Sequence, residues 1–324
     1  SMKLIASILT VAAFASAGSL QKEPLRSDLA KLTSGFDGRV GICAQDKSGV
    51  VCVNGDQRFS LQSVMKLIVG VAVMDAVDQG KMKLDDAVLI HREDLSLYVQ
   101  PIAKLVGDKG YTTTIGDLVR RGIVDSDSAA ADILVAKLGG PKAVQAFLNR
   151  KHVSGLRLDR DERHLQTEIS GLEWRTEFID PAALERARAA VPDARRTEAY
   201  QKYQADVRDT ATARGMAAFL FSLAEGKLVS PASSAHLLQV MTQTVTSPDR
   251  LKAGVSGGWS LGHKTGTSGS WKGLTAATND VGILTAPDGA HVAIAVLIGD
   301  SRETSARRAE VTAAAARTVI GHYR

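Results

Sequence analysis

Ser63 and Lys66 stand three residues apart at the start of a run that is apolar on nearly every side, residues 67–77. Residues at this spacing share one face of a helix, so the lysine amine would reach the serine oxygen. The first helical turn also offers free backbone N–H groups and positive dipole character. Burial favours a neutral amine, which could activate Ser63 as a nucleophile. Ser19-Leu20-Gln21-Lys22 has the same spacing but opens no such run, so this pattern alone is weak.

A second pair of hydroxyl groups lies in Ser126-Asp127-Ser128, between the apolar runs 122–124 and 129–135. Ser and Asp are preferred helix N-caps, so the segment could simply begin a helix. Alternatively, Ser126 could lie on the opposite wall of a cleft and pass a proton to a leaving nitrogen. Taken alone, the segment favours the helix cap over the proton relay.

The third segment, Lys264-Thr265-Gly266-Thr267, occurs once, between strand-like stretches. Gly266 has no side chain, so a ligand could approach the strand edge there. Lys264 and the hydroxyls of Thr265 and Thr267 offer charge and hydrogen-bond donors to a carboxylate. The three segments together would describe an acyl-transfer site, whereas a loop containing Lys-Thr-Gly by chance is the alternative.

The three motifs in this order resemble those of the penicillin-recognising serine acyltransferases, and more closely those of the class A serine β-lactamases. A fourth segment, residues 160–166, is similar to the family's omega-loop motif. In that motif a Glu, followed four residues later by Asn, holds the water that hydrolyses the acyl-enzyme. Glu162 and Gln166 take these positions here. Penicillin-binding peptidases lack this Glu, so Glu162 favours a hydrolase over those relatives.

The resemblance implies a role for each catalytic residue. Ser63 would attack the lactam carbonyl in an oxyanion hole formed by the backbone N–H groups of Ser63 and Thr267. Lys66, or Glu162 through a water, would deprotonate Ser63. Ser126 would relay the proton to the lactam nitrogen. Glu162 would then activate the deacylating water.

The resemblance also implies a substrate-binding set. Arg250 resembles the family arginine that reaches the substrate carboxylate beside Lys264 and Thr265. Tyr98 is either the aromatic residue at the cleft rim or a surface tyrosine. No cofactor and no metal site are expected, because the seven His residues show no metal-binding spacing.

Two substitutions depart from the family pattern. Ser128 stands where the motif has Asn, and its single hydroxyl has a shorter reach than an amide. We therefore expect weaker contact with the amide side chain of penicillins. Gln166 replaces the Asn beside the deacylating water, which predicts slower deacylation. Gln62, before Ser63, stands where many carbapenem-hydrolysing relatives have a cysteine.

The omega loop is the third departure. The family arginine that closes this loop corresponds to Arg160, and its expected partner is Asp209, so residues 171–204 are extra. Asp180-Pro181 begins one amphipathic run and Pro192-Asp193 begins another, which predicts two short helices. A disordered insert is the alternative. Packed against the cleft, the insert could restrict bulky substrates or recruit a partner.

The pattern of elements predicts how these segments meet. Residues 37–60 and 259–298 read as strands, residues 63–240 as helices, and residues 302–320 as a final helix. Strand material from both ends predicts an α+β fold: an antiparallel sheet flanked by terminal helices, with an inserted all-α domain. We expect an α/β domain from residues 18–60 and 242–324, and an all-α domain, 61–241, containing the omega loop 160–209.

Composition narrows the possible partners. The chain has 324 residues, 44% of them hydrophobic, which is enough for a packed core. Its net charge of +5 comes from scattered Lys and Arg, and only 5% of residues are aromatic, which argues against nucleic-acid binding. We expect a monomer whose partners are β-lactam antibiotics.

The N-terminal residues have the pattern of a targeting sequence. Lys3, the apolar run 4–14 and Ala15-Ser16-Ala17 are typical of a secretory signal peptide, residues 1–17. The run is shorter than the roughly 20 residues that span a bilayer, so no membrane anchor is expected after cleavage. This predicts export of a bacterial protein to the periplasm or the medium.

Export would permit a disulfide between the only two cysteines, Cys43 and Cys52. The two residues lie in two strand-like runs joined by a turn. A two-residue loop at Lys47-Ser48 would place them opposite each other, whereas a bulge at Gly49 would place Cys43 opposite Val53. The turn residues favour the bulge, and both registers stay open.

Two other function classes share the acylation motifs. A cell-wall DD-peptidase or esterase would use Ser63, Lys66, Ser126 and Lys264 without needing Glu162. A penicillin-binding sensor would acylate and deacylate slowly, which Ser128 and Gln166 could favour.

Overall fold

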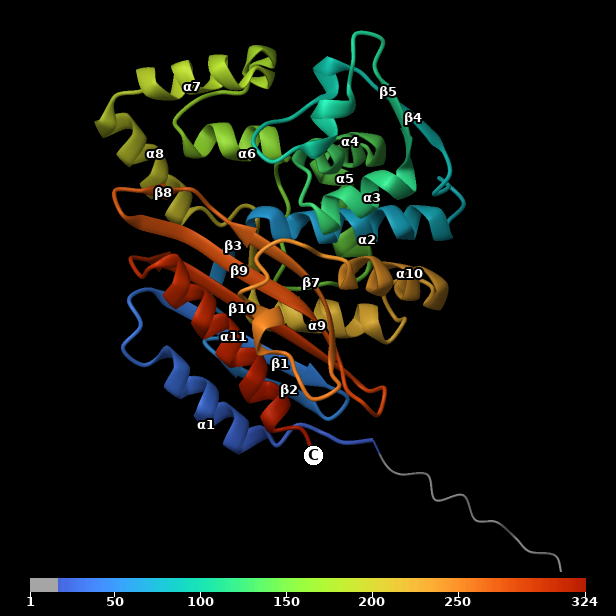
Figure 1. Ribbon diagram of the computed structural model, residues 1–324, viewed down its shortest axis with the longest axis vertical. Helices are drawn as coiled ribbons and strands as arrows, with labels where there is room; N and C mark the ends of the chain where they lie inside the picture. The colour runs from blue at the N-terminus through green and yellow to red at the C-terminus, as the bar shows by residue number, and fades with distance from the viewer. Residues whose placement is uncertain (1–16) are drawn as a thin grey trace, which may run out of the picture.

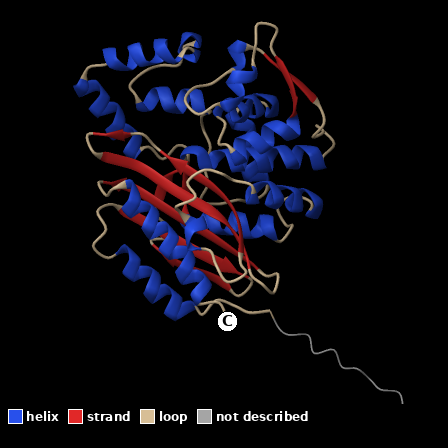
Figure 2. Cartoon of the chain, in the orientation of Figure 1, coloured by secondary structure: helices blue, strands red, loops and turns tan. Residues whose placement is uncertain are grey.

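The computed structural model describes residues 17–324, and its centre is an antiparallel sheet (Figures 1 and 2). Five strands run in the order β2, β1, β10, β9, β7, and the short β8 also pairs with β9. The N-terminal hairpin thus pairs with the last strand, which confirms the predicted α+β class. The bounds are β1 Arg39–Asp46, β2 Gly49–Val53, β7 Ser260–Thr267, β8 Ser270–Trp271, β9 Leu274–Thr285 and β10 His291–Ser301.

Side chains of β10 alternate between two apolar layers, as the period of two in a strand requires. Val292, Ile294 and Val296 pack with the terminal helices α1 and α11, whereas Ala293 and Ala295 pack with α9 on the other face. The predicted final helix is therefore present, and α9 is close to the sheet because the β10 side chains facing it are small. The bounds are α1 Lys22–Thr33, α9 Ala213–Ala224 and α11 Ser305–Gly321.

The helical region lies beside one end of the sheet, around the buried helix α2 (Figure 1). Helices α3, α4, α5 and α10 pack against α2, so its apolar surface is covered on all sides, as predicted. The bounds are α2 Met65–Asp78, α3 Ile115–Val124, α4 Ser128–Leu138, α5 Pro141–Arg150, α6 Glu162–Ile169, α7 Pro181–Ala190, α8 Asp193–Ala205 and α10 Pro231–Thr242, with short 3-10 helices η1 Gln62–Val64, η2 Arg92–Asp94, η3 Pro101–Leu105, η4 Thr176–Ile179 and η5 Leu251–Gly254.

The expectation that residues 63–240 form only helices is wrong at two places. Strands β4, Ala87–Ile90, and β5, Tyr111–Thr114, form a separate hairpin, and β6, Thr210–Thr212, pairs with β3, Arg58–Ser60. These strands are three or four residues long, too short for a clear period of two. No helix in residues 17–324 is long and apolar enough to cross a membrane. The expected signal peptide, residues 1–17, lies outside the described residues apart from Ala17.

The two cysteines form a disulfide, with Cys43 directly opposite Cys52. The favoured bulge at Gly49 is wrong, because Asp46 pairs with Gly49 across a two-residue turn. Asp46 explains the difference. One carboxylate oxygen accepts the Ser48 N–H at 2.8 Å, and the other accepts the distant Leu20 N–H at 2.7 Å. This second contact fixes the turn from outside the hairpin.

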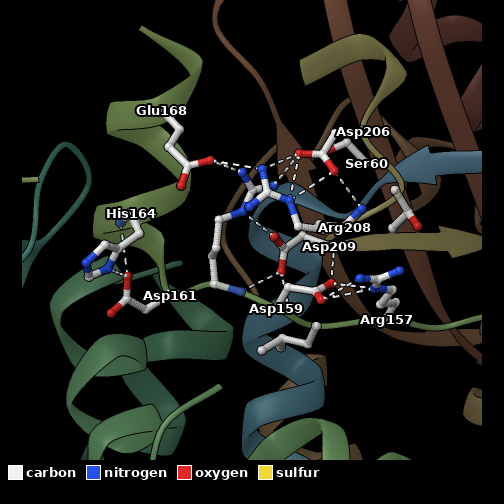
Figure 3. Close-up of polar contacts among 12 residues, drawn as sticks. Ser60, Arg157, Asp159, Asp161, His164, Glu168, Asp206, Arg208 and Asp209 are labelled. Atoms are coloured by element: carbon white, nitrogen blue, oxygen red, sulfur yellow. Dashed lines mark hydrogen bonds and ion pairs between the residues drawn. The ribbon is translucent and has the colours of Figure 1, made fainter. Parts of the chain in front are cut away.

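The neck of the omega loop is closed by the predicted pair of Arg160 and Asp209, with Nε 2.7 Å from Oδ2. Arg160 also contacts the carboxylates of Glu168 and Asp206, and Arg208 binds Asp206 at 2.7 Å. Figure 3 shows the three carboxylates, on Glu168, Asp206 and Asp209, turned toward this cluster of guanidinium groups. The loop is therefore tied at both of its ends before the extra residues begin.

The two predicted helices of the insertion are confirmed as α7 and α8, and Asp180 caps the first by accepting the Ala182 N–H. The disordered alternative is thus excluded. The single hydroxyl proton of Tyr200, on α8, is shared between the carbonyls of Gly269 and Leu274, at 2.8 and 3.0 Å, and the hydroxyl oxygen accepts the Ala276 N–H at 2.9 Å. One hydroxyl therefore joins the insertion to the β8 edge of the sheet.

Tyr200→Phe should lower the free energy of unfolding by about 2 kcal/mol, because the buried Ala276 N–H loses its acceptor. Chemical denaturation followed by circular dichroism measures this change. Tyr111→Phe is the matched control, since the Tyr111 hydroxyl has no hydrogen-bonding partner within residues 17–324. Equal stability losses in both variants would contradict the assignment of Tyr200 as the anchor.

Candidate active site

Ser63 lies in η1, directly before α2, where strand β7 approaches the backbone. A Cβ atom at Gly266 would lie 2.8 Å from the Leu61 carbonyl oxygen and 3.1 Å from the Ser63 nitrogen. Only glycine permits this approach without displacing the chain. Asn279 supports the same segment by donating to the Ser60 carbonyl at 2.7 Å. The edge of β7 and the nucleophile segment are thus fixed side by side.

The amine of Lys66 is buried and contacts two other segments of the chain. It donates to the Ser126 carbonyl at 2.6 Å and to the Ser128 hydroxyl at 3.0 Å. The carboxylate of Glu162 lies 3.7 Å away. The predicted residues Ser126, Ser128 and Glu162 therefore meet around one nitrogen.

The capping question in the second motif is resolved by Asp127. Its carboxylate caps α4 by accepting the Ala130 N–H at 2.9 Å, and its other oxygen accepts the Ile102 N–H at 2.8 Å. The preceding residue, Ser126, has a φ of 57°, which turns the chain sharply before the helix. Because the aspartate caps the helix, the hydroxyls of Ser126 and Ser128 remain available to the site.

Lys264 meets the Ser126 hydroxyl from the side opposite Lys66. Its Nζ atom lies 3.0 Å from Ser126 Oγ and donates to its neighbour's carbonyl, on Thr265, at 2.8 Å. Burial holds the pKa of Lys264 well below its usual range, and the nearby charge of Lys66 lowers it further. Ser126 Oγ, 3.4 Å from the Lys66 amine, thus lies within hydrogen-bonding distance of both amines.

Glu162 is held at the start of α6 by Asp132. The Asp132 carboxylate accepts the N–H groups of Glu162 and Arg163, at 2.8 and 3.2 Å, and the Ser96 hydroxyl at 2.7 Å. Burial, together with the charges of Asp161 and Glu162, raises the pKa of Asp132 to about 8. The three donors offset part of the free-energy cost of burying this carboxylate. Two of them are backbone N–H groups of α6, so they also fix the position from which the Glu162 side chain extends.

A chain of hydrogen bonds connects Glu162 with the insertion. Gln166 Nε2 lies 3.2 Å from Glu162 Oε2 and 2.8 Å from Gln62 Oε1. The Gln62 amide in turn donates to the hydroxyl of Tyr203, on α8, which also contacts Ser60. Burial raises the pKa of Tyr203, so its hydroxyl stays protonated. The other carboxylate oxygen of Glu162, Oε1, is buried without a hydrogen-bonding partner among the described residues.

Gln62 and Tyr203 were not predicted as part of the site. The direction of the Gln62 side chain depends on a backbone φ of 46°, which no sequence pattern indicates. Tyr203 lies on α8, about 140 residues further along the chain, and no sequence pattern pairs it with Gln62. Their contribution follows only from the folded arrangement.

Arg250 is buried behind β7, where burial lowers its pKa. It donates to the Thr267 hydroxyl at 2.7 Å and to the Asn279 carbonyl at 3.0 Å. Thr265 shares a hydrogen bond with Thr246 at 2.6 Å. The cation and the hydroxyl groups of the third motif thus lie together along one strand edge.

These groups surround a cavity of about 350 Å³. Tyr98 lies at its rim, with 49% of its surface exposed. The predicted residues that line the cavity are Ser63, Lys66, Tyr98, Ser128, Glu162, Gln166 and Thr267. The others, Ser126, Lys264, Thr265, Gly266 and Arg250, are buried or close-packed around it.

Comparison with known proteins decides the family. A family model described as "Beta-lactamase enzyme family" matches residues 24–323. The solved structure of an ancestral class A β-lactamase (GNCA) is 32% identical, with a TM-score of 0.74, and covers 92% of this chain and 99% of that one. The chain belongs to the class A β-lactamase family. The resemblance read from the motifs is confirmed, and so is the prediction that the protein is a hydrolase.

Two curated relatives match along nearly their whole length. Beta-lactamase VEB-1 of Pseudomonas aeruginosa is 27% identical over 94% of this chain and 91% of its own. The extended-spectrum beta-lactamase PER-1 of the same organism is 27% identical over 97% of this chain and 92% of its own. Membership of this β-lactamase family implies β-lactam substrates.

Asp132→Asn should lower the free energy of unfolding by about 2 kcal/mol and slow β-lactam turnover. The amide has the size of the carboxylate, but one of its two ends is an NH2 group. That NH2 group would face one of the three N–H or O–H groups that donate to Asp132 in the wild type. Denaturant unfolding and steady-state kinetics measure the two effects. Asp108→Asn, at an exposed turn, is the control. Wild-type stability and turnover in Asp132→Asn would be inconsistent with this role.

Proposed function

We propose that this β-lactamase cleaves the β-lactam amide through an acyl-enzyme on Ser63 and releases the product with water activated by Glu162. The observation that carries the proposal is the position of Glu162. Its carboxylate shares the cavity of Ser63, lies 3.7 Å from Lys66 and is hydrogen-bonded to Gln166. A peptidase would not need a carboxylate there.

In the acylation step, Ser63 Oγ attacks the lactam carbonyl carbon and its proton passes to a base. That base is either Lys66, as a neutral amine, or Glu162 through a water. The developing oxyanion is stabilised by the backbone N–H groups of Ser63 and Thr267. The close approach of Gly266 to the Ser63 nitrogen supports this assignment, because it fixes the two segments relative to each other.

Breakage of the C–N bond requires a proton on the leaving nitrogen. Ser126 Oγ gives its proton to that nitrogen and regains one from the shared set of Lys66 and Lys264. The lowered pKa of Lys264 makes its proton easier to give up. The proton removed from Ser63 thus ends on the nitrogen of the opened ring.

In the deacylation step, Glu162 takes a proton from a water as the water oxygen attacks the ester carbonyl. The ester C–O bond then breaks, and Ser63 Oγ receives the proton back. Gln166 positions the Glu162 carboxylate and is itself held by Gln62. The substrate carboxylate binds near Lys264, Thr265, Thr267 and Arg250, where cations and hydroxyls lie together.

We also infer that the protein is exported, to the periplasm or the medium, and acts as a monomer. The signal-peptide pattern of residues 1–17 supports export. The disulfide between Cys43 and Cys52 supports an oxidising compartment.

Wild-type protein should hydrolyse the chromogenic cephalosporin nitrocefin, and Ser63→Ala should lose activity about a thousandfold or more, because the nucleophile is gone. Glu162→Ala should still acylate but accumulate a penicilloyl adduct, visible by intact mass spectrometry. A lasting adduct on the wild type would instead indicate a penicillin-binding sensor. Full turnover by Glu162→Ala would indicate the peptidase or esterase mechanism.

Ser128→Asn should raise kcat/KM for at least one amide-bearing β-lactam, since the longer amide offers both a donor and an acceptor to the substrate side chain. Steady-state kinetics on a panel of penicillins and cephalosporins measures this. Ser154→Asn, on the surface of a loop, serves as the control. Unchanged or lower kcat/KM across the panel would reject this account of Ser128.

A further inference from the structure

The insertion of the omega loop forms part of the wall of the Ser63 cavity. Helix α7 contributes Arg188 and helix α8 contributes Arg196 and Tyr200, opposite the turn of residues 268–270. Both arginines are half-buried. The extra residues therefore bring two guanidinium groups to the cavity that holds the nucleophile.

Arg196 lies over an aromatic ring and has no acidic partner among the described residues. Its guanidinium carbon lies 4.4 Å from the ring centroid of Trp271, and the indole N–H is itself fixed by Thr197 at 3.0 Å. No carboxylate within residues 17–324 lies at ion-pair distance from Arg196. This cation–π contact holds the guanidinium group over the indole ring, and no acidic side chain occupies its N–H donors.

Arg188 approaches from the rim. Its guanidinium carbon lies 5.6 Å from the ring centroid of Tyr98. One terminal nitrogen reaches Glu185, whose side chain is 72% exposed, at 3.2 Å. Its Nε atom is buried without a hydrogen-bonding partner among the described residues. Only part of its hydrogen-bonding capacity is therefore used.

The described residues that line the cavity carry more positive than negative charge. Its only acidic lining residue is Glu162, which already faces Lys66 at 3.7 Å. In the proposed reaction the carboxylate on the opened ring binds near Lys264 and Arg250, on the β7 side. Arg188 and Arg196 lie on the opposite, omega-loop side, and no acidic group of the cavity is left to pair with them.

We propose that Arg188 and Arg196 form a subsite for an anionic group on the acyl side chain of the substrate. This inference rests on the proposed hydrolysis at Ser63. A carboxylate or sulfonate fits it, because the planar edge of a guanidinium binds two oxygens at once. The preferred substrates are then β-lactams with two anions, one on the ring and one on the side chain.

Benzylpenicillin and carbenicillin test this directly, because the second differs by one carboxylate on the side chain. The measured quantity is the ratio of kcat/KM for carbenicillin to kcat/KM for benzylpenicillin. Arg196→Gln should lower this ratio about tenfold, and Arg188→Gln with Arg196→Gln should lower it further. Arg196→Lys should lower the ratio less than Arg196→Gln does, because it keeps the positive charge but loses the paired N–H donors.

The controls are Arg186→Gln and Arg195→Gln, on the same two helices but outside the cavity lining. A fall confined to the cavity variants supports the subsite. An unchanged ratio in the double variant, or an equal fall in the controls, overturns it. Absence of benzylpenicillin hydrolysis by the wild type would refute the proposed function itself, which is a different result from hydrolysis with an unchanged ratio.

Discussion

The buried amine of Lys66 is the constraint on which the site depends. An amine away from water is costly unless its hydrogen-bonding groups find partners. Here the acceptors are the Ser126 carbonyl, in the turn before α4, and the Ser128 hydroxyl, on the first residue of α4, while the Glu162 carboxylate of α6 lies 3.7 Å away as a charged neighbour. Each of these segments must therefore be positioned close to the Lys66 amine if the amine is to keep its partners. The same packing brings Ser126, Ser128 and Glu162 to Ser63.

The omega loop shows how this constraint coexists with a long extra segment. Asp132 holds the first turn of α6, and Arg160 with Asp209 closes the neck of the loop. Both ties lie outside residues 171–204, so the added helices do not interrupt them. The insertion adds a third tie through Tyr203 and Gln62, which reaches the residue before the nucleophile.

The features that could be predicted from the sequence are those that depend on residues close together in the chain. The three motifs indicate reactive groups, and the Asp-Pro and Pro-Asp pairs indicate the two helices of the insertion. The sequence could not predict features that depend on distant partners. The hairpin register follows from a contact between Asp46 and Leu20, and the place of Gln62 follows from an unusual φ and from a tyrosine far along the chain.

Helix α8 carries Tyr200 and Tyr203 one turn apart, and the first binds the β8 edge of the sheet while the second binds Gln62. Moving this helix away from the cavity would require both of these hydrogen bonds to break. Substitution of an α8 residue that lines the cavity, such as Arg196, would therefore change the shape of the cavity while both attachments of the helix stay in place.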